Sequence, residues 1–221
     1  MLSMNKISFS YGKKSAKKHI VDDFSLHVAP GECVVLAGHN GAGKSTLLSI
    51  AAGILSPDSG SVDLGGKLAY VPQGTALPED MTVDECLHFF ARLSKCSVPD
   101  TLPFSVNEIR RQRISSLSGG MKKQVSIACA TLSDPPIILL DEPTSALDII
   151  FRDEMEKVVL EWKSKNKAIV YVAHDPMEFY SFFDTLVILG KKVRIHKRSD
   201  LTPQTADADS FASFFRSELL L

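Results

Sequence analysis

The chain lacks the long apolar runs of a membrane-spanning protein. Its longest uninterrupted apolar stretches hold about six residues, whereas a spanning helix needs about 20. Its first residues also lack the basic start and the apolar stretch of a secretory signal peptide. An excess of one charge is missing too, because 25 Lys and Arg face 26 Asp and Glu, for a net charge of −1. We therefore expect neither a span of the bilayer by this chain nor a nucleic-acid partner.

Cysteine is scarce, and no C-x-x-C pair occurs. The four cysteines lie far apart at Cys33, Cys86, Cys96 and Cys129. This spacing is unlike a zinc site or a disulfide framework, and it predicts reduced thiols in a cytoplasmic protein. The length of 221 residues, 44% of them hydrophobic, is enough for one large domain with a sizeable core.

Four short apolar runs dominate the sequence pattern. They do not alternate polar with apolar residues, which is typical of strands that are buried on both faces of a sheet. The runs cover residues 33–37, 137–140, 168–173 and 185–189. Helical patterns separate them at residues 44–54, 121–132, 149–165 and 176–183. This alternation predicts an α/β fold with a mostly parallel core sheet.

Two regions depart from this rhythm. Residues 7–11 and 24–28 alternate strictly, and two more short strand candidates lie within residues 60–71, so we expect a small antiparallel sheet beside the core. Residues 75–116 instead predict a small helical insertion. Two capping-box patterns, Thr82 with Glu85 and Ser105 with Glu108, mark the starts of its helices.

The last residues return to a helical apolar pattern. Four side chains fall on one helical face: Phe211, Phe214, Phe215 and Leu219. Packing of this face against the domain is favoured over a dimer or membrane contact.

A glycine-rich segment follows the first buried run. Residues 38–45, GHNGAGKS, match G-x-x-x-x-G-K-[ST] between a strand and a helix, the context of a phosphate-binding P-loop. Glycines let backbone N–H groups surround phosphate oxygens, and the helix N-terminus adds a favourable dipole. Lys44 would reach the β- and γ-phosphates, and the Ser45 hydroxyl would bind magnesium. The predicted nucleotide contacts are His39, Asn40, Gly41, Ala42, Gly43, Lys44, Ser45 and Thr46, with a solvated loop position as the alternative for His39.

A second acidic element suits such a loop. The buried run at residues 137–140 ends in Asp141 and Glu142. Asp141 is positioned to hold magnesium through water, and Glu142 to polarise a water that attacks the γ-phosphate. The alternative is an ordinary helix N-cap pair at the end of a strand.

A third motif points to a family. Residues 117–121, LSGGM, followed by Gln124, stand before the helix that leads to the Asp141 strand. Here the sequence resembles the ATP-binding cassette (ABC) ATPases over essentially the whole chain. The resemblance implies one ABC ATPase domain over residues 1–221. Residues 1–74 and 117–221 would form the RecA-like core with the antiparallel sheet, and residues 75–116 the helical subdomain.

The resemblance also assigns further site residues. Gln73 matches the Q-loop and would bind magnesium, residues 145–148 match the D-loop, and His174 matches the switch histidine that senses the γ-phosphate. Tyr11 stands about where the family places the aromatic residue that stacks on adenine. From the residues alone, Tyr11 also fits a half-buried strand position, Gln73 a plain loop and His174 a structural role.

The resemblance implies a site shared by two chains. Ser118, Gly119 and Gly120 would start a helix whose N-terminus suits an anion. In the family that anion is the γ-phosphate held by the partner's P-loop. Each site would then use Lys44 and Glu142, which with His174 form the predicted catalytic set, together with Ser118 of the other chain. ATP and Mg²⁺ are the implied cofactors. A homodimer is favoured, and a heterodimer with a second cassette remains open.

The resemblance further implies an energy-coupling subunit of a transporter. Because this chain has no span of its own, a separate integral membrane permease would be its partner. The chain would lie in the cytoplasm, peripherally on the inner face of the cell membrane. Residues 81–93, ending in FFARL, are similar to export-type prokaryotic cassettes, although a helix packing on its own insertion explains the same residues. The alternative function is a soluble, non-transport ABC ATPase in assembly or translation.

Overall fold

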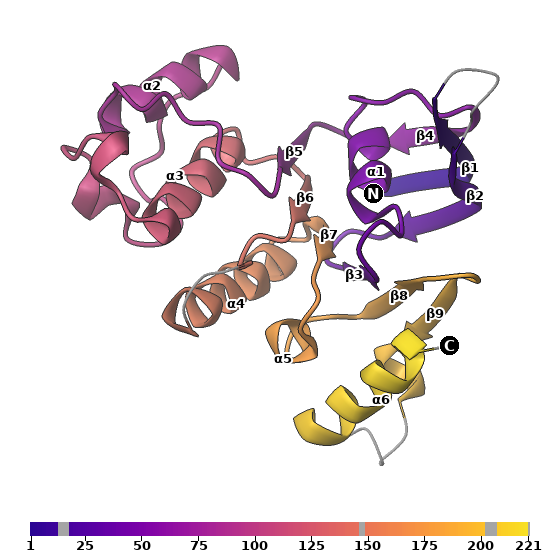
Figure 1. Ribbon diagram of the computed structural model, residues 1–221. Coiled ribbons are helices and arrows are strands. Elements are labelled where there is room, and N and C mark those ends of the chain that lie inside the picture. Colours follow the sequence, from indigo (N-terminus) through magenta and orange to yellow (C-terminus); the bar gives the residue numbers. More distant parts are fainter. Residues whose placement is uncertain (13–17, 146–148, 202–206, 221) are drawn as a thin grey trace.

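A six-stranded sheet forms the centre of the molecule (Figure 1). The computed structural model describes residues 1–12, 18–145, 149–201 and 207–220. The strand order is β5–β6–β7–β3–β8–β9, parallel except for β9, which runs antiparallel to β8. The strands are β3 (Cys33–Gly38), β5 (Leu68–Val71), β6 (Ile137–Asp141), β7 (Ala168–Val172), β8 (Thr185–Leu189) and β9 (Arg194–Lys197). The four apolar runs of the sequence are thus confirmed as β3, β6, β7 and β8.

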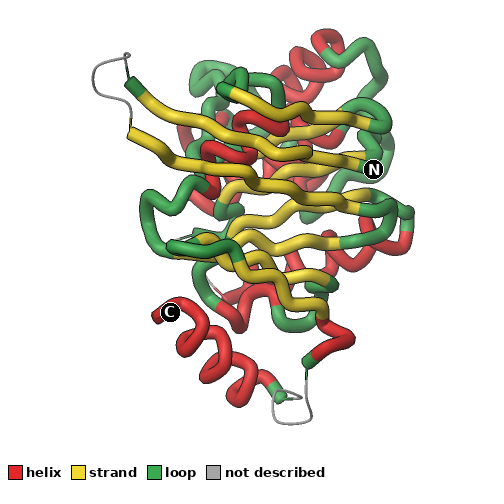
Figure 2. The backbone as a smooth tube through the Cα atoms, turned by 90° about the vertical axis from the view of Figure 1, so that its right-hand side faces the viewer, coloured by secondary structure: helices red, strands yellow, loops and turns green. Residues whose placement is uncertain are grey.

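A three-stranded antiparallel sheet covers part of this core (Figure 2). Its order is β2–β1–β4, with β1 (Leu2–Tyr11), β2 (Lys18–Val28) and β4 (Ser59–Leu64). Of the two strand candidates within residues 60–71, only β4 belongs to this sheet. The other, β5, pairs in parallel with β6 and adds an edge to the core sheet, because the chain turns at Gly65 and Gly66.

Alternate residues of the core strands face two different layers. In β3, Val35 packs with the helices α4, α5 and α6, whereas Leu36 packs with α1 and the antiparallel sheet. These helices are α1 (Lys44–Ala51), α4 (Ile149–Ser164), α5 (Pro176–Phe179) and α6 (Ala208–Leu220). The two layers explain why the core strands read as continuous apolar runs.

Two further helices lie to one side of the core, α2 (Val83–Leu93) and α3 (Gly119–Thr131) (Figure 1). They pack on each other in a separate apolar cluster, with Leu87 of α2 and Val125 of α3 among its members. This cluster takes residues from both sides of position 117. The division of the chain at that position therefore stays a prediction.

Only one of the two predicted capping boxes forms. Thr82 Oγ1 accepts from the Glu85 backbone N–H at 3.2 Å, and Glu85 Oε2 accepts from the Thr82 N–H at 2.8 Å. The prediction at Ser105 is wrong, because only a short 3₁₀ turn (Val106–Ile109) comes after it. There the Glu108 N–H donates to the Ser105 carbonyl oxygen, and the Ser105 side chain caps nothing.

The C-terminal helix α6 packs against the domain, as predicted. Phe211 and Phe215 are buried against Phe179 and Phe183 of the α5 region. The Phe211 and Phe183 rings stack with centroids 5.1 Å apart. Residue 221, the end of the predicted helix, lies outside the described residues.

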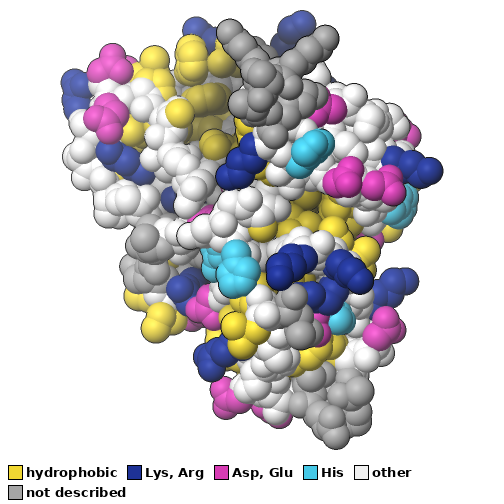
Figure 3. All heavy atoms as spheres, turned by 45° about the vertical axis from the view of Figure 1, so that its right-hand side comes forward, with side chains coloured by type: hydrophobic (Ala, Val, Ile, Leu, Met, Phe, Trp, Pro, Cys, Tyr) yellow, Lys and Arg dark blue, Asp and Glu magenta, His cyan; other side chains and the backbone are white. Residues whose placement is uncertain are grey.

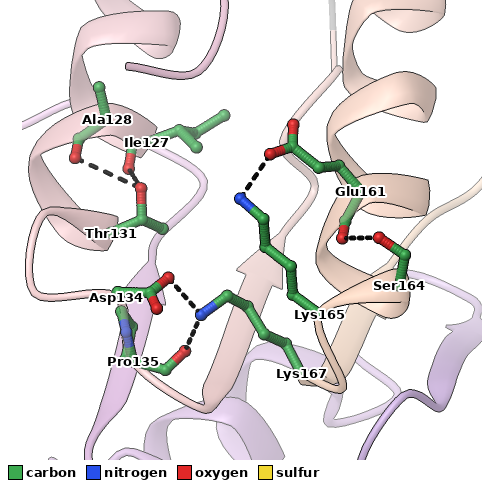
Figure 4. A network of polar contacts seen from close by, with 9 residues as sticks. All are labelled: Ile127, Ala128, Thr131, Asp134, Pro135, Glu161, Ser164, Lys165 and Lys167. Carbon is green, nitrogen blue, oxygen red and sulfur yellow. Dashed lines mark hydrogen bonds and ion pairs between the residues drawn. The ribbon is translucent and has the colours of Figure 1, made fainter. Parts of the chain in front are cut away.

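Lysines fix the turns that lead into two core strands (Figure 4). The buried Lys167 donates to the Pro135 carbonyl oxygen at 3.0 Å and pairs with Asp134 at 2.6 Å. Nearby, Lys165 pairs with Glu161 of α4 at 2.6 Å. Since Pro135 precedes β6 and Lys167 precedes β7, the Lys167 contacts align the starts of two strands whose other ends carry predicted site residues.

The thiols and the surface agree with the composition. All four cysteines are free, and the Cys86 and Cys129 sulfur atoms approach to 3.9 Å. On the face shown in Figure 3, basic, acidic and histidine side chains are interspersed. Within the part of the chain that the structure describes, no helix combines the length and the apolar character that crossing a bilayer requires.

Candidate nucleotide-binding site

The loop between β3 and α1 depends on glycines at both ends. Gly38 and Gly43 have φ angles of 145° and 99°, which side chains other than glycine rarely adopt. A Cβ on Gly38 would lie 2.4 Å from the Leu189 carbonyl oxygen, and one on Gly43 would lie 3.0 Å from Ile20. The loop therefore curls tightly between a buried strand and a helix start, which is the context expected for a P-loop.

Lys44 is a buried cation at the first position of α1. Its ammonium group donates to the carbonyl oxygens of Gly38 at 2.8 Å and His39 at 3.1 Å. Burial lowers the pKa of Lys44, and the Glu142 and Asp141 carboxylates partly oppose that effect. An anion in the loop would meet this cation together with the N–H groups of the helix start.

Ser45 and Asp141 place two oxygen donors beside that cation. The Ser45 hydroxyl donates to Asp141 Oδ1 at 3.2 Å. Burial at the end of β6 raises the pKa of Asp141, and the hydrogen bond from Ser45 partly offsets this. A hydroxyl with a carboxylate suits Mg²⁺, which usually keeps waters and phosphate oxygens as its other ligands. The residues present therefore fit the metal that the sequence implies.

Glu142 joins three segments of the chain. One carboxylate oxygen accepts from Gln73 Nε2 at 2.8 Å, and the other lies 2.6 Å from His174 Nε2. Gln73 follows β5, Glu142 follows β6, and His174 follows β7, so the parallel sheet brings all three to one edge. Glu142 itself has a φ of 47°, which is uncommon for a residue with a side chain.

Lys44, Ser45, Gln73, Glu142 and His174 line one cavity of about 810 Å³, and Asp141 lies behind the lining, joined to it by the hydrogen bond from Ser45. Its lining residues are Tyr11, Lys18, Ile20, Asn40, Gly41, Gly43, Lys44, Ser45, Thr46, Gln73, Glu142, Ser145 and His174. The cavity thus runs from Glu142, Gln73 and His174 past the phosphate loop to Tyr11 of β1 and Lys18 of β2.

Tyr11 stands at that end of the cavity. Its hydroxyl lies 3.5 Å from Thr46 Oγ1, and its ring meets the Phe9 ring edge-on at 4.8 Å. The Tyr11 side chain remains about half exposed. A planar ligand could therefore reach its open face.

Two of the predicted nucleotide contacts, His39 and Ala42, lie apart from the cavity lining. The His39 ring contacts the carbonyl oxygen of Leu219 in α6 at 2.8 Å. Ala42 lies in a neighbouring hollow beside Leu47 and Leu189. The nucleotide contacts expected of these two side chains stay predictions, although the His39 carbonyl does accept from Lys44.

The LSGG residues also lie outside this cavity. Ser118 caps α3, and its Oγ accepts from the Met121 N–H at 3.2 Å. Ser118 and Gly119 are exposed, and Gly120 is partly exposed. None of these three residues lines the cavity described above. Of the expected D-loop, Ser145 lines the cavity, and residues 146–148 lie outside the described residues.

The sequence did not single out the buried Lys123. Its ammonium group donates to the carbonyl oxygens of Pro72 and Gln73. Lys122 precedes it in the same helix and is the same residue type, so the sequence pattern alone does not tell which of the two is buried. Lys18 and Ile20 of the cavity likewise carry no motif.

The fold and the loop geometry define a P-loop nucleotide-binding ATPase. A family model described as ABC transporter matches residues 21–145. The Nod factor export ATP-binding protein I of Paraburkholderia xenovorans (strain LB400) is 36% identical over 214 residues, which cover 87% of this chain and 69% of that protein. The chain belongs to the ABC transporter family and is an ATP-binding subunit of that class.

Other similar proteins differ in the direction that their names state. The taurine import ATP-binding protein TauB of Jannaschia sp. (strain CCS1) is 33% identical over 212 residues, covering 86% of this chain and 78% of that protein. Among solved structures, an ATP-binding subunit of an ABC transporter superposes with a TM-score of 0.84 at 27% identity, over all of both chains. A bacterial ABC transporter cassette, solved as a dimer, shares the fold with a TM-score of 0.76 at 22% identity, over 89% of this chain and 98% of that one.

Proposed function

We propose that this chain hydrolyses ATP to drive export through a separate integral membrane permease. The observation that carries the proposal is the meeting of Lys44, Ser45 and the Gln73–Glu142–His174 cluster around one cavity, with Asp141 hydrogen-bonded to Ser45. A phosphate-binding cation, a metal-binding oxygen pair and a candidate general base are the groups that phosphoanhydride hydrolysis needs.

Nucleotide binding would use the P-loop and Tyr11. The Lys44 ammonium group would exchange the Gly38 and His39 carbonyls for β- and γ-phosphate oxygens, while the adenine stacks on the open face of Tyr11. Ser45, Gln73 and, through water, Asp141 would hold Mg²⁺. The ion would supply charge neutralisation for the phosphate oxygens.

Hydrolysis would depend on Glu142. Its carboxylate would take a proton from the attacking water as the new oxygen–phosphorus bond forms and the bond to the β-γ bridging oxygen breaks. ADP then carries the electron pair of the broken bond. His174 is within hydrogen-bond reach of Glu142 and would hold both this carboxylate and the γ-phosphate in place.

A second copy would complete each site. Ser118, Gly119 and Gly120 begin α3 away from the chain's own cavity, and Ser118 is exposed. Exposed N–H groups at a helix start suit an anion, so we place the γ-phosphate of the partner chain there. A homodimer provides two such sites, and a heterodimer with another cassette would do so as well.

The partner in the membrane would dock on the helical subdomain. In α2, one face is buried by Val83, Cys86 and Leu87, whereas Phe89 and Leu93 are exposed. Packing within the subdomain explains the buried residues of α2, and a permease contact would explain the exposed Phe89 and Leu93. With such a contact the chain would lie in the cytoplasm, peripherally on the inner face of the membrane. The similarity of residues 81–93 to export-type cassettes supports the outward direction.

Turnover of the purified chain tests the chemistry. Wild-type protein should release phosphate from ATP in the presence of Mg²⁺, and Glu142→Gln should lower kcat by about 10²- to 10⁴-fold while still binding ATP. A Glu142→Gln variant that turns over near the wild-type rate would exclude Glu142 as the base.

Native copurification tests the role in transport. The chain, extracted in mild detergent, should carry an integral membrane protein with it. Isolation with ribosomal or other soluble assemblies, and no membrane protein, would instead support the soluble ATPase alternative.

A further inference from the structure

Lys123 is a buried charge that the proposed chemistry does not use. It lies in the second turn of α3 and is only 4% exposed. Burial lowers its pKa to about 8, although the Asp141 and Glu142 carboxylates act in the opposite direction. Burying an ammonium group is costly unless hydrogen bonds satisfy it, so its partners matter.

Those partners are two consecutive carbonyl groups of the main chain. Lys123 Nζ lies 2.7 Å from the Pro72 carbonyl oxygen and 2.9 Å from that of Gln73. Both residues directly follow β5, which lies beside α3 (Figure 1). Two hydrogen bonds from Lys123 therefore hold α3 against the backbone at Pro72 and Gln73.

The contact continues to the candidate base. The Gln73 side chain donates to Glu142 Oε2 at 2.8 Å. At the other end of the path, Ser118 caps the same helix that carries Lys123. A rigid helix thus links Ser118 through Lys123 and Gln73 to Glu142.

We propose that Lys123 is a positioning residue that couples the placement of α3 to the placement of Gln73 against Glu142. The inference rests on the proposed function, since it concerns the same hydrolysis. Lys123 does not line the cavity and its ammonium group donates to the Pro72 and Gln73 carbonyls, so it acts through Gln73 rather than on the nucleotide. Through Lys123, the position of the Gln73 side chain against Glu142 would depend on the position of α3, whose first turn carries Ser118.

The preceding residue offers a matched control. Lys122 has the same side chain on the same helix, but it pairs with the exposed Glu79 at 2.7 Å. Replacing Lys122 changes the charge of α3 by the same amount without touching the Pro72–Gln73 backbone.

The first experiment measures kcat and KM for ATP in three variants. Lys123→Met should lower kcat about tenfold and leave KM within about twofold, because alignment is lost and binding is kept. Lys123→Arg, which retains a cation with several donors, should recover most of the rate. Lys122→Met should match the wild type. Unchanged kcat in Lys123→Met, or KM rising in step with the loss of kcat, would overturn the proposal.

The second experiment is a double-mutant cycle with Gln73→Ala. If Lys123 acts through Gln73, adding Lys123→Met to Gln73→Ala should lower kcat no further. Fully multiplicative losses would overturn the proposal. Should Lys123→Met not fold, as judged by circular dichroism, Lys123→Gln takes its place in the same cycle, because its shorter amide does not reach both carbonyls.

The two proposals fail in different ways. An inactive wild type would refute the proposed function itself. An active wild type with a silent Lys123→Met would refute only the positioning role.

Discussion

Single charged residues in the site are held by specific neighbours rather than by solvent. The Lys44 ammonium group rests on two loop carbonyls, and Glu142 is contacted by Gln73 and His174. The contacts of Glu142 hold its carboxylate at the cavity before a ligand arrives, whereas the carbonyl contacts of Lys44 would be exchanged for phosphate oxygens on binding.

Removing the Lys44 charge should abolish tight ATP binding. Charge-assisted hydrogen bonds to phosphate are worth about 1.5–3 kcal/mol each, so Lys44→Ala should weaken binding by roughly a hundredfold or more. Isothermal titration with ATP measures this directly. Lys67→Ala, which removes an exposed lysine, serves as the control. Undiminished affinity in Lys44→Ala would refute the phosphate-binding role.

A partly buried acid outside the cavity lining, Glu178, should make stability depend on pH. The Glu178 carboxylate accepts from the hydroxyl groups of Tyr171 and Thr144, yet burial raises its pKa above the usual 4.5. The folded chain therefore keeps this proton at a pH where the unfolded chain has lost it. The resulting stability is present below about pH 4.5 and is lost as pH rises through the folded-state pKa.

Glu178→Gln removes that loss. The free energy of unfolding of Glu178→Gln minus that of the wild type should increase as pH rises from about 4.5 toward neutrality, as measured by urea denaturation. Glu79→Gln is a control, because Lys122 lowers the pKa of Glu79 below 4.5. For that variant the same difference should fall as pH rises toward about 4.5 and stay level above it. Parallel profiles of unfolding free energy against pH for Glu178→Gln and the wild type would contradict a raised pKa of Glu178.

At the scale of elements, local sequence decides some helix starts and tertiary pairing decides the rest. Both Thr82 and Ser105 precede a glutamate at the spacing of a capping box, but only Thr82 starts an α-helix. The difference lies in the residues after each cap, since α2 buries an apolar face and the turn after Ser105 runs for only four residues.

This difference has a measurable consequence for stability. Thr82→Ala should lower the free energy of unfolding by about 1 kcal/mol, the usual value of a lost N-cap. Ser105→Ala should change it by less than about 0.5 kcal/mol, because that side chain caps nothing. Chemical denaturation of the two variants and the wild type measures both changes in the free energy of unfolding. Equal losses would contradict the observed capping.

The core strands and the P-loop could be predicted from the sequence, because the patterns that mark them are local. Continuous apolar runs mark β3, β6, β7 and β8, and glycine spacing marks the loop after β3. Sheet membership of β5 was not predictable, because a four-residue strand carries no sign of its partner. The strand β9 was missed since Arg194 and His196 look like surface residues, although both contact Glu218 of α6.

Site residues divide along the same line. Lys44, Asp141 and Glu142 stand in motifs, whereas Lys123 and Glu178 act through burial that only the folded chain creates. The helix α1 is also shorter than its pattern predicts, because Gly53 takes a φ of 72° just after it. Burial and backbone conformation thus account for most differences between expectation and structure.

At the scale of the whole molecule, one chain holds a complete set of ATPase motifs but exposes one of them away from its cavity. The P-loop, Asp141 and Glu142 converge, and Ser118 starts α3 elsewhere on the surface. This separation predicts that two chains associate when ATP binds, with each site formed by both of them.

The mass of Glu142→Gln in solution tests this claim most directly. Light scattering after gel filtration should give the chain mass of 24.2 kDa without nucleotide and about twice that with ATP. A Ser118→Arg change in the same background should keep the mass at that of one chain, because the partner's phosphate contact is lost. A mass that stays at 24.2 kDa in saturating ATP, or that is doubled without it, would contradict the account.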